Sequence, residues 1–102
     1  MARVLCRSHL VVPTITIYEV FKRVLLQTDE GTALQSIAVM QEGRIVDLDH
    51  PLALRAAAIS AAEKLPMADS VILATARSFG ATLWTQDVDF NGLDGVKYFP
   101  RA

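Results

Sequence analysis

The chain has 102 residues, which is the size of one domain and enough to bury a single hydrophobic core. Its apolar content of 52% excludes a disordered polypeptide, while its apolar runs are far shorter than the roughly 20 residues that cross a bilayer. The net charge of −1 excludes a protein that holds nucleic acid by overall positive charge, so any such contact must be local, metal-assisted or shared with a partner.

The first predicted elements are a strand and a helix. Residues 9–14 are apolar and largely β-branched and end in turn chemistry at Pro13, a pattern typical of a short buried strand. Apolar residues then recur at helical spacing, which predicts a helix over residues 16–27. Thr14 or Thr16 is expected to cap that helix, because a threonine hydroxyl can accept from the free backbone N–H groups of a first turn.

A second helix, a strand and an alanine-rich helix follow. Residues 29–31 break the first helix, and apolar spacing predicts the next one over residues 32–41. The alternation in residues 44–49 predicts a strand. Pro51 then opens the alanine-rich helix at its first position, and this helix is expected to end near Lys64.

One more helix and two strands are predicted in the last part of the chain. Pro66 opens the helix and Gly80 closes it. The residues expected to face inward on it are Ala68, Ile72, Thr75 and Phe79. Residues 81–85 and 96–99 are predicted strands, joined by a loop. Strands separated by helices need crossover connections, so we expect one α/β domain over residues 1–102, a parallel sheet with helices on both faces.

Three acids fall where such a sheet places its functional site. Glu19 lies early in the helix after the first strand, Asp69 in the first turn after Pro66, and Asp87 just past residues 81–85. Ligands of open α/β sheets bind outside the carboxyl ends of the strands, where acids far apart in sequence can meet. Converging carboxylates repel one another unless a cation lies between them, and all-oxygen sites suit Mg²⁺ or Mn²⁺ rather than zinc.

Each acid also has an ordinary structural interpretation. Glu19 points away from the apolar stripe of its helix and could be solvated. Asp69 would be favoured near a helix start by the free N–H groups and the helix dipole. Asp87 could be a turn acid. It is the combination of the three that favours a metal site.

Three segments resemble the PIN-domain nucleases. Residues 16–20 (Thr-Ile-Tyr-Glu-Val) are similar to the glutamate segment of that family. Residues 65–76 (Leu-Pro-Met-Ala-Asp-Ser-Val-Ile-Leu-Ala-Thr-Ala) and 80–90 (Gly-Ala-Thr-Leu-Trp-Thr-Gln-Asp-Val-Asp-Phe) resemble its C-terminal block. The resemblance runs from His9 onward and implies a PIN-like three-layer fold.

The resemblance also implies an activity and a set of site residues. PIN domains hold Mg²⁺ or Mn²⁺ and cleave RNA, and many small members are toxins of VapC type that an antitoxin neutralises. Carried over, Glu19, Asp69 and Asp87 would be the catalytic, metal-binding acids, with Asp89 as a possible auxiliary ligand and Thr85 orienting the site by hydrogen bonding. The metal would activate water for in-line attack on a phosphodiester.

The chain departs from the family before His9. PIN domains begin with a central strand that ends in an aspartate, and residues 1–8 contain no acid. We interpret those residues as the tail of a helix, with Arg7 and His9 near its C-terminal end, and expect roughly twenty family residues to be absent. Loss of a central strand leaves unpaired edges, so the chain is expected to re-pair its own strands, oligomerise through the edges or express poorly.

Several other residues are assigned structural roles. His9 and His50 share no metal-ligand spacing. Trp84 lies inside an apolar strand and is expected to be core rather than a platform for stacking bases. Lys22 and Arg23 could touch phosphate, but a solvated helix face is the simpler interpretation.

Two alternatives to an active ribonuclease remain open. One is an inactive PIN remnant that still binds an antitoxin or a second copy of itself. The other is an unrelated α/β module such as a phosphoacceptor receiver, although the paired N-terminal acids of such a site are missing.

The single cysteine, Cys6, is interpreted as a small apolar residue. A single cysteine cannot form an internal disulfide, which is compatible with the reducing cytoplasm.

Overall fold

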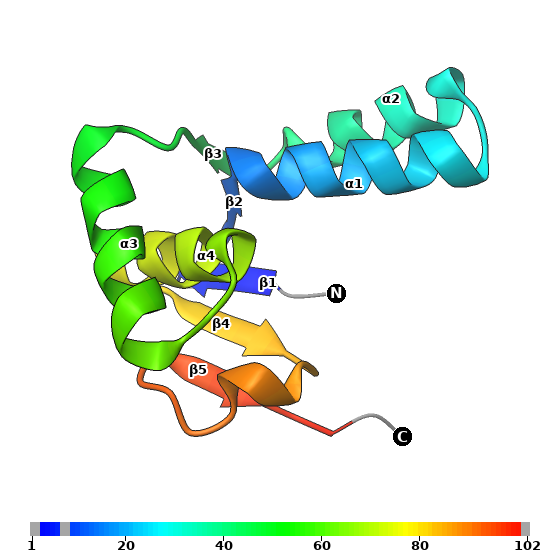
Figure 1. The fold of residues 1–102 in the computed structure, drawn as a ribbon. Coiled ribbons are helices and arrows are strands. Elements are labelled where there is room, and N and C mark those ends of the chain that lie inside the picture. Colours follow the sequence, from blue (N-terminus) through cyan, green and yellow to red (C-terminus); the bar gives the residue numbers. More distant parts are fainter. Residues whose placement is uncertain (1–2, 7–8, 101–102) are drawn as a thin grey trace.

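The computed structural model describes residues 3–6 and 9–100, which form one sheet with four α-helices and a short 3₁₀ helix (Figure 1). The strands are β1 (Arg3–Cys6), β2 (His9–Pro13), β3 (Arg44–Val46), β4 (Thr82–Thr85) and β5 (Val96–Tyr98). The helices are α1 (Thr14–Gln27), α2 (Glu30–Met40), α3 (His50–Glu63), α4 (Met67–Ser78) and the 3₁₀ helix η1 (Val88–Phe90). None of the described helices is long and apolar enough to cross a membrane.

The five strands are ordered β3-β2-β1-β4-β5, with β1 at the centre. Strand β1 runs antiparallel to both of its neighbours, while β2 and β3 are parallel, as are β4 and β5. Four of the five strands therefore point the same way. This mostly parallel sheet with its helices confirms the predicted α/β fold class, and the reversed central strand is the difference from the prediction.

The interpretation of the segment before His9 as a helix tail is wrong. Residues Arg3–Cys6 form a strand, His9 begins the next strand, and Arg7 lies outside the described residues. Val4 pairs with Val11 on one side and Leu83 on the other, and its side chain is only 3% exposed. Eight residues are too few for periodicity to separate helix from strand, and pairing on both sides decides the outcome.

The central position of the sheet is therefore filled by the chain itself. Of the three outcomes expected for a missing first strand, the structure shows the first, in which the chain re-pairs its own strands. Because β1 bonds to β2 and β4, residues 9–11 of β2 and 82–84 of β4 have strand partners on the side that faces the centre.

The helix starts differ from the predicted caps. Helix α1 follows Pro13 directly and has no side-chain cap, so neither Thr14 nor Thr16 caps it. Helix α2 is capped by Asp29, whose Oδ1 accepts from the Thr32 N–H at 2.7 Å. That hydrogen bond lowers the pKa of the Asp29 carboxyl.

The strand predicted over residues 44–49 ends early. Strand β3 stops at Val46, which pairs with Pro13, the last residue of β2. Asp49 then caps α3: its Oδ1 accepts from the Leu52 N–H at 2.9 Å, and its own backbone is extended, as is usual for a capping residue.

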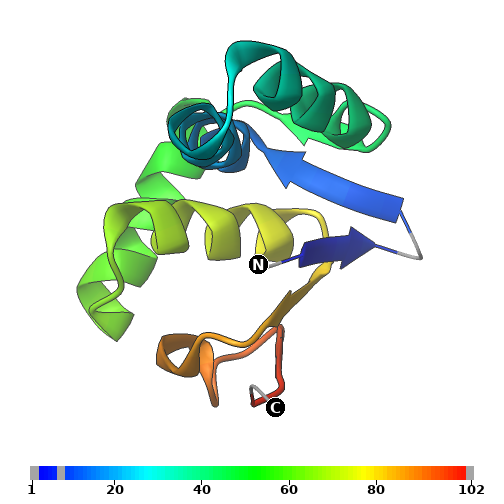
Figure 2. The same ribbon diagram turned by 90° about the vertical axis from the view of Figure 1, so that its right-hand side faces the viewer.

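Helix α4 forms the centre of the core. Every residue from Ser70 to Ala76 is buried, and α3 packs beside α4 on the same face of the sheet (Figure 2). Of the row expected to face inward, Ile72 and Thr75 are buried, whereas Ala68 and Phe79 are half-buried. Gly80 follows the helix with φ of 60°, a left-handed conformation that glycine adopts without strain.

The opposite face of the sheet is covered differently. The hairpin of α1 and α2 packs against itself and extends beyond the β2 and β3 side of the sheet (Figures 1 and 2). On the β1 and β4 side, Trp84 is 39% exposed, so the prediction that it is core is wrong. Successive residues of a strand face opposite sides, and Leu83 takes the position toward α4.

Candidate functional site

The candidate acids lie on three separate segments. Glu19 is in α1, which begins immediately after β2. Asp69 is in the first turn of α4, and Asp87 follows β4, two residues before Asp89 in η1. Asp69 is half-buried, and the other three acids are exposed.

Electrostatics show that the other three acids are within reach of Asp69. Burial raises the pKa of the Asp69 carboxyl above its ordinary value, and the negative charges of Asp87, Glu19 and Asp89 raise it further, in that order. Like charges disfavour ionisation only when they are within reach of each other. The fold therefore gathers four carboxylates from α1, α4 and the segment after β4 into one electronegative region centred on Asp69.

Thr85 organises the Asp87 end of this region. Its side chain is 3% exposed, and its Oγ1 accepts a hydrogen bond from the Asp87 backbone N–H at 3.0 Å. Asp87 in turn accepts from the Asp89 N–H through Oδ1 at 3.0 Å. These two bonds hold the chain turning from β4 into η1, so Thr85 supports the position of both aspartates.

Sequence reasoning missed one supporting residue, Ser70. Its side chain is 1% exposed, and its Oγ donates to the backbone oxygen of Pro66 at 2.9 Å. The bond fastens the first turn of α4, directly beside Asp69. A hydroxyl one residue after the acid, on an otherwise apolar helix, was the available signal.

The donors suit a hard cation, but they do not form a closed cage. Within residues 3–6 and 9–100, no three His, Cys, Asp or Glu side chains are placed so that they could hold one ion together. Mg²⁺ commonly keeps several waters and binds through one or two carboxylates plus substrate. Carboxylates are the donor type that such a water-rich divalent ion takes, and Asp69 is the carboxyl on which the charges of the other three acids act.

At the centre of the sheet, the edge formed by the carboxyl ends of the parallel strands carries a cation. Because β1 runs antiparallel, its first described residue, Arg3, lies beside Trp84 near the carboxyl end of β4. The family resemblance implies an aspartate at the end of the central strand, and β1 contains no acid. The fourth acid of the region is instead Asp89, on the chain after β4.

Comparison with known proteins identifies the family. The sequence matches the PIN domain family over residues 2–96. The chain belongs to the PIN-domain family. Among solved structures, this PIN domain is similar to a toxin–antitoxin complex from Klebsiella pneumoniae, with a TM-score of 0.78 and 26% sequence identity. That match covers 89% of this chain and 75% of the other, and no curated protein matches.

Family membership gives the general class of protein to which this chain belongs. PIN domains are generally nucleases that use divalent metals, and the matched region contains Glu19, Asp69, Asp87 and Asp89. A receiver-type phosphoacceptor module is therefore excluded by the family match.

Proposed function

We propose that this PIN domain is a Mg²⁺- or Mn²⁺-dependent endoribonuclease of VapC toxin type that hydrolyses RNA phosphodiesters. The observation that supports this proposal most directly is the raised pKa of Asp69, because it reflects a half-buried carboxyl on which the negative charges of three further acids act. A perturbed carboxyl among other acids is characteristic of functional sites. Hard divalent cations relieve such repulsion, which gives the family's metal a reason to bind here.

The proposed roles follow from the positions of the side chains. Asp69, Asp87 and Glu19 would hold the metal, with Asp89 as an auxiliary acid; when bound, the metal supplies an activated water and neutralises charge on the phosphate. Thr85 positions Asp87 through its backbone N–H. Burial and the negative charges of its neighbours favour the neutral form of Asp69 by raising the pKa of its carboxyl.

An antitoxin protein and a second copy of this chain are the proposed protein partners, and the cytoplasm is the proposed compartment. The structural neighbour is a toxin–antitoxin complex, and the α1–α2 hairpin exposes large apolar side chains. These side chains are Tyr18, Leu25, Leu26, Leu34 and Val39. Exposed apolar groups clustered on one projecting element are typical of a protein interface.

An inactive PIN module that only binds partners is the second candidate. Two observations favour it: no three described acids are placed to hold one ion, and Arg3 lies where the resemblance implies an aspartate. The two candidates differ in whether metal and RNA chemistry take place at the acids.

Cleavage of labelled RNA in the presence of Mn²⁺ tests the proposal. We expect metal-dependent cleavage and a metal-induced rise in melting temperature, because an ion that binds only the folded state stabilises it. Asp69→Asn and Asp87→Asn should lower cleavage by at least about 10- to 100-fold and reduce the thermal response.

The control is Asp94→Asn. Asp94 is an exposed acid in the turn before β5, at the opposite end of the strands, so its replacement should leave both readouts unchanged. A folded wild type that shows neither cleavage nor a thermal response to Mn²⁺ would favour the inactive module.

A further inference from the structure

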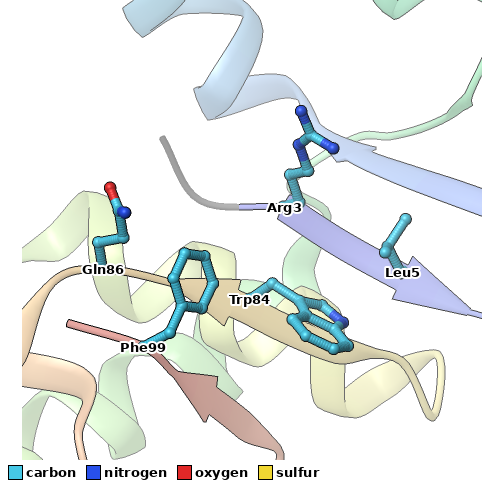
Figure 3. Close-up of a pocket in the computed structure, with 5 residues that line it drawn as sticks. All are labelled: Arg3, Leu5, Trp84, Gln86 and Phe99. Carbon is cyan, nitrogen blue, oxygen red and sulfur yellow. The ribbon is translucent and has the colours of Figure 1, made fainter. Parts of the chain in front are cut away.

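A pocket of about 340 Å³ opens on the face of the sheet that carries Trp84 (Figure 3). It is lined by Arg3, Leu5, Trp84, Gln86 and Phe99, all from strands or from residues directly after a strand. Figure 3 shows the Trp84 indole with Phe99 on one side and Leu5 on the other. The volume is within the range of roughly 300–1,000 Å³ that small-molecule sites occupy.

The aromatic rings of this pocket are accessible. Trp84 is 39% exposed and Phe99 is 42% exposed. Large aromatic side chains exposed on a surface are suited to stacking against another flat ring.

The charge of this face is positive. None of the described residues in the five strands is an acid, and no acid lines the pocket. Arg3 lines it, and Lys97 extends its ammonium over the Trp84 ring at 6.0 Å from the centroid. That distance is at the outer limit of a cation–π contact, so Lys97 is free to turn toward a phosphate.

The pocket also adjoins the proposed catalytic acids. Gln86 lines it and is followed directly by Asp87. Arg3 pairs with Trp84, so the cation is at the same end of the strands. A chain lying across Trp84 can thus continue over Gln86 to the acidic region.

We infer that this pocket is a binding platform for single-stranded RNA, in which a base stacks on Trp84 beside Phe99 while Lys97 and Arg3 contact the adjoining phosphates. Flat rings need an aromatic surface and phosphates need cations, and proteins that hold single strands combine the two. An apolar protein partner would gain nothing from the two cations. The inference deepens the proposed function, because it identifies single-stranded RNA as the substrate form that Trp84 positions.

Trp84 is the only tryptophan in the sequence, so its fluorescence reports on this pocket alone. Titration with a short oligouridylate in the presence of a chelator should quench that fluorescence, since base stacking occurs without metal and without cleavage. An RNA duplex of the same length should quench it much less, because its bases are already stacked on each other.

Variants at Trp84 separate stacking from apolar contact. With binding followed by anisotropy of labelled RNA, Trp84→Phe should retain most of the affinity, whereas Trp84→Leu should lose about 5- to 150-fold. Leu54→Ala, at an exposed apolar residue of α3, is the control and should bind like the wild type. Melting curves for each variant establish that it is folded.

Charge variants test the phosphate contacts. Lys97→Gln and Arg3→Gln should each reduce the salt dependence of binding by about 0.7 in the slope of log K against log salt. Arg55→Gln is the matched control, because Arg55 is an exposed arginine of α3 that donates to Ser78 Oγ at 3.0 Å, on the helical side of the molecule.

The outcomes distinguish this inference from the proposed function. Quenching and Trp84-dependent binding without metal-dependent cleavage would support the platform and contradict the nuclease. Cleavage with Trp84→Leu binding RNA as tightly as Trp84→Phe would support the nuclease and overturn the platform. A dimer in light scattering that Trp84→Leu dissociates, together with no quenching by RNA, would mean that a second copy of the chain covers this face and would also overturn it.

Discussion

Asp69 is the acid of the candidate site whose pKa is raised by folding. Its carboxyl is partly removed from water and faces the charges of Asp87, Glu19 and Asp89. A carboxyl whose pKa is raised by folding stabilises the folded state at pH values below its unfolded pKa, here the ordinary 3.8, and this contribution is lost as the pH rises through the folded pKa. At neutral pH and without metal, the ionised Asp69 therefore opposes folding.

Asp69→Asn should consequently stabilise the metal-free protein at pH 7, since it removes a charge while keeping the shape of the side chain. We expect a gain below about 1 kcal/mol, because the group is partly exposed and its interactions are screened by solvent. The gain should shrink on acidification and vanish below pH 3.8. Denaturant unfolding across this pH range, in the presence of chelator, measures it; equal stabilities of the two proteins at pH 7 would contradict the electrostatic argument.

Thr85 acts on the site through one hydrogen bond, from the Asp87 N–H to its Oγ1. Thr85→Val keeps the volume and removes the acceptor, so the partly buried N–H loses its partner at a cost of about 1–3 kcal/mol. We expect cleavage to fall by about 10- to 100-fold, as is usual when a group that orients a metal ligand is removed. Thr85→Ser restores the oxygen and should recover most of the activity; recovery by valine instead would show that the hydroxyl has no positioning role.

At the scale of elements, β1 determines whether the sheet is continuous. Its strand is four residues long and occupies the centre, with Val4 packed among the buried residues beneath α4. Val4→Ala removes two methyl groups and should destabilise the protein by about 2 kcal/mol, from lost burial plus the cavity that remains. Val39→Ala, at a residue of α2 that is 66% exposed, should change stability by less than about 0.5 kcal/mol. Similar unfolding midpoints for the two variants would argue against a central β1.

At the scale of the whole molecule, the α1–α2 hairpin is the element that projects from the rest of the fold (Figure 1). It extends beyond the sheet, and Leu26 on α1 is 77% exposed (Figure 1). We expect the chain to self-associate through this hairpin, and Leu26→Glu to shift it toward the monomer by placing a charge in the interface. Leu54→Glu, at a residue of α3 that is 61% exposed, is the control and should leave the mass unchanged. Light scattering over a range of concentrations gives the masses; a wild type that stays monomeric throughout would contradict this expectation.

Local sequence pattern was sufficient to predict the helices and to name the candidate acids. Helix α4 was predicted from Pro66 to Gly80 and is observed as Met67–Ser78, because a long apolar period closed by glycine has few other solutions. The spacing of Asp69 and Asp87 within the C-terminal block was enough to indicate the PIN family, which the match over residues 2–96 confirms. The helix caps were not predicted correctly: α1 begins after Pro13 without a side-chain cap, and α2 and α3 are capped by Asp29 and Asp49.

Tertiary structure alone decided the direction of β1, the exposure of Trp84 and which charged side chains act on Asp69. Residues Arg3–Cys6 suit a strand only because β2 and β4 offer backbone partners on both sides, and no local signal records those partners. Alternation places Leu83 and Trp84 on opposite faces, but which face α4 covers depends on packing between distant segments. The charges that act on Asp69 likewise come from residues far away in sequence. The sequence by itself determined the family, the fold class and the residue types available for chemistry, because these depend on local spacing, while their arrangement depends on long-range pairing and burial.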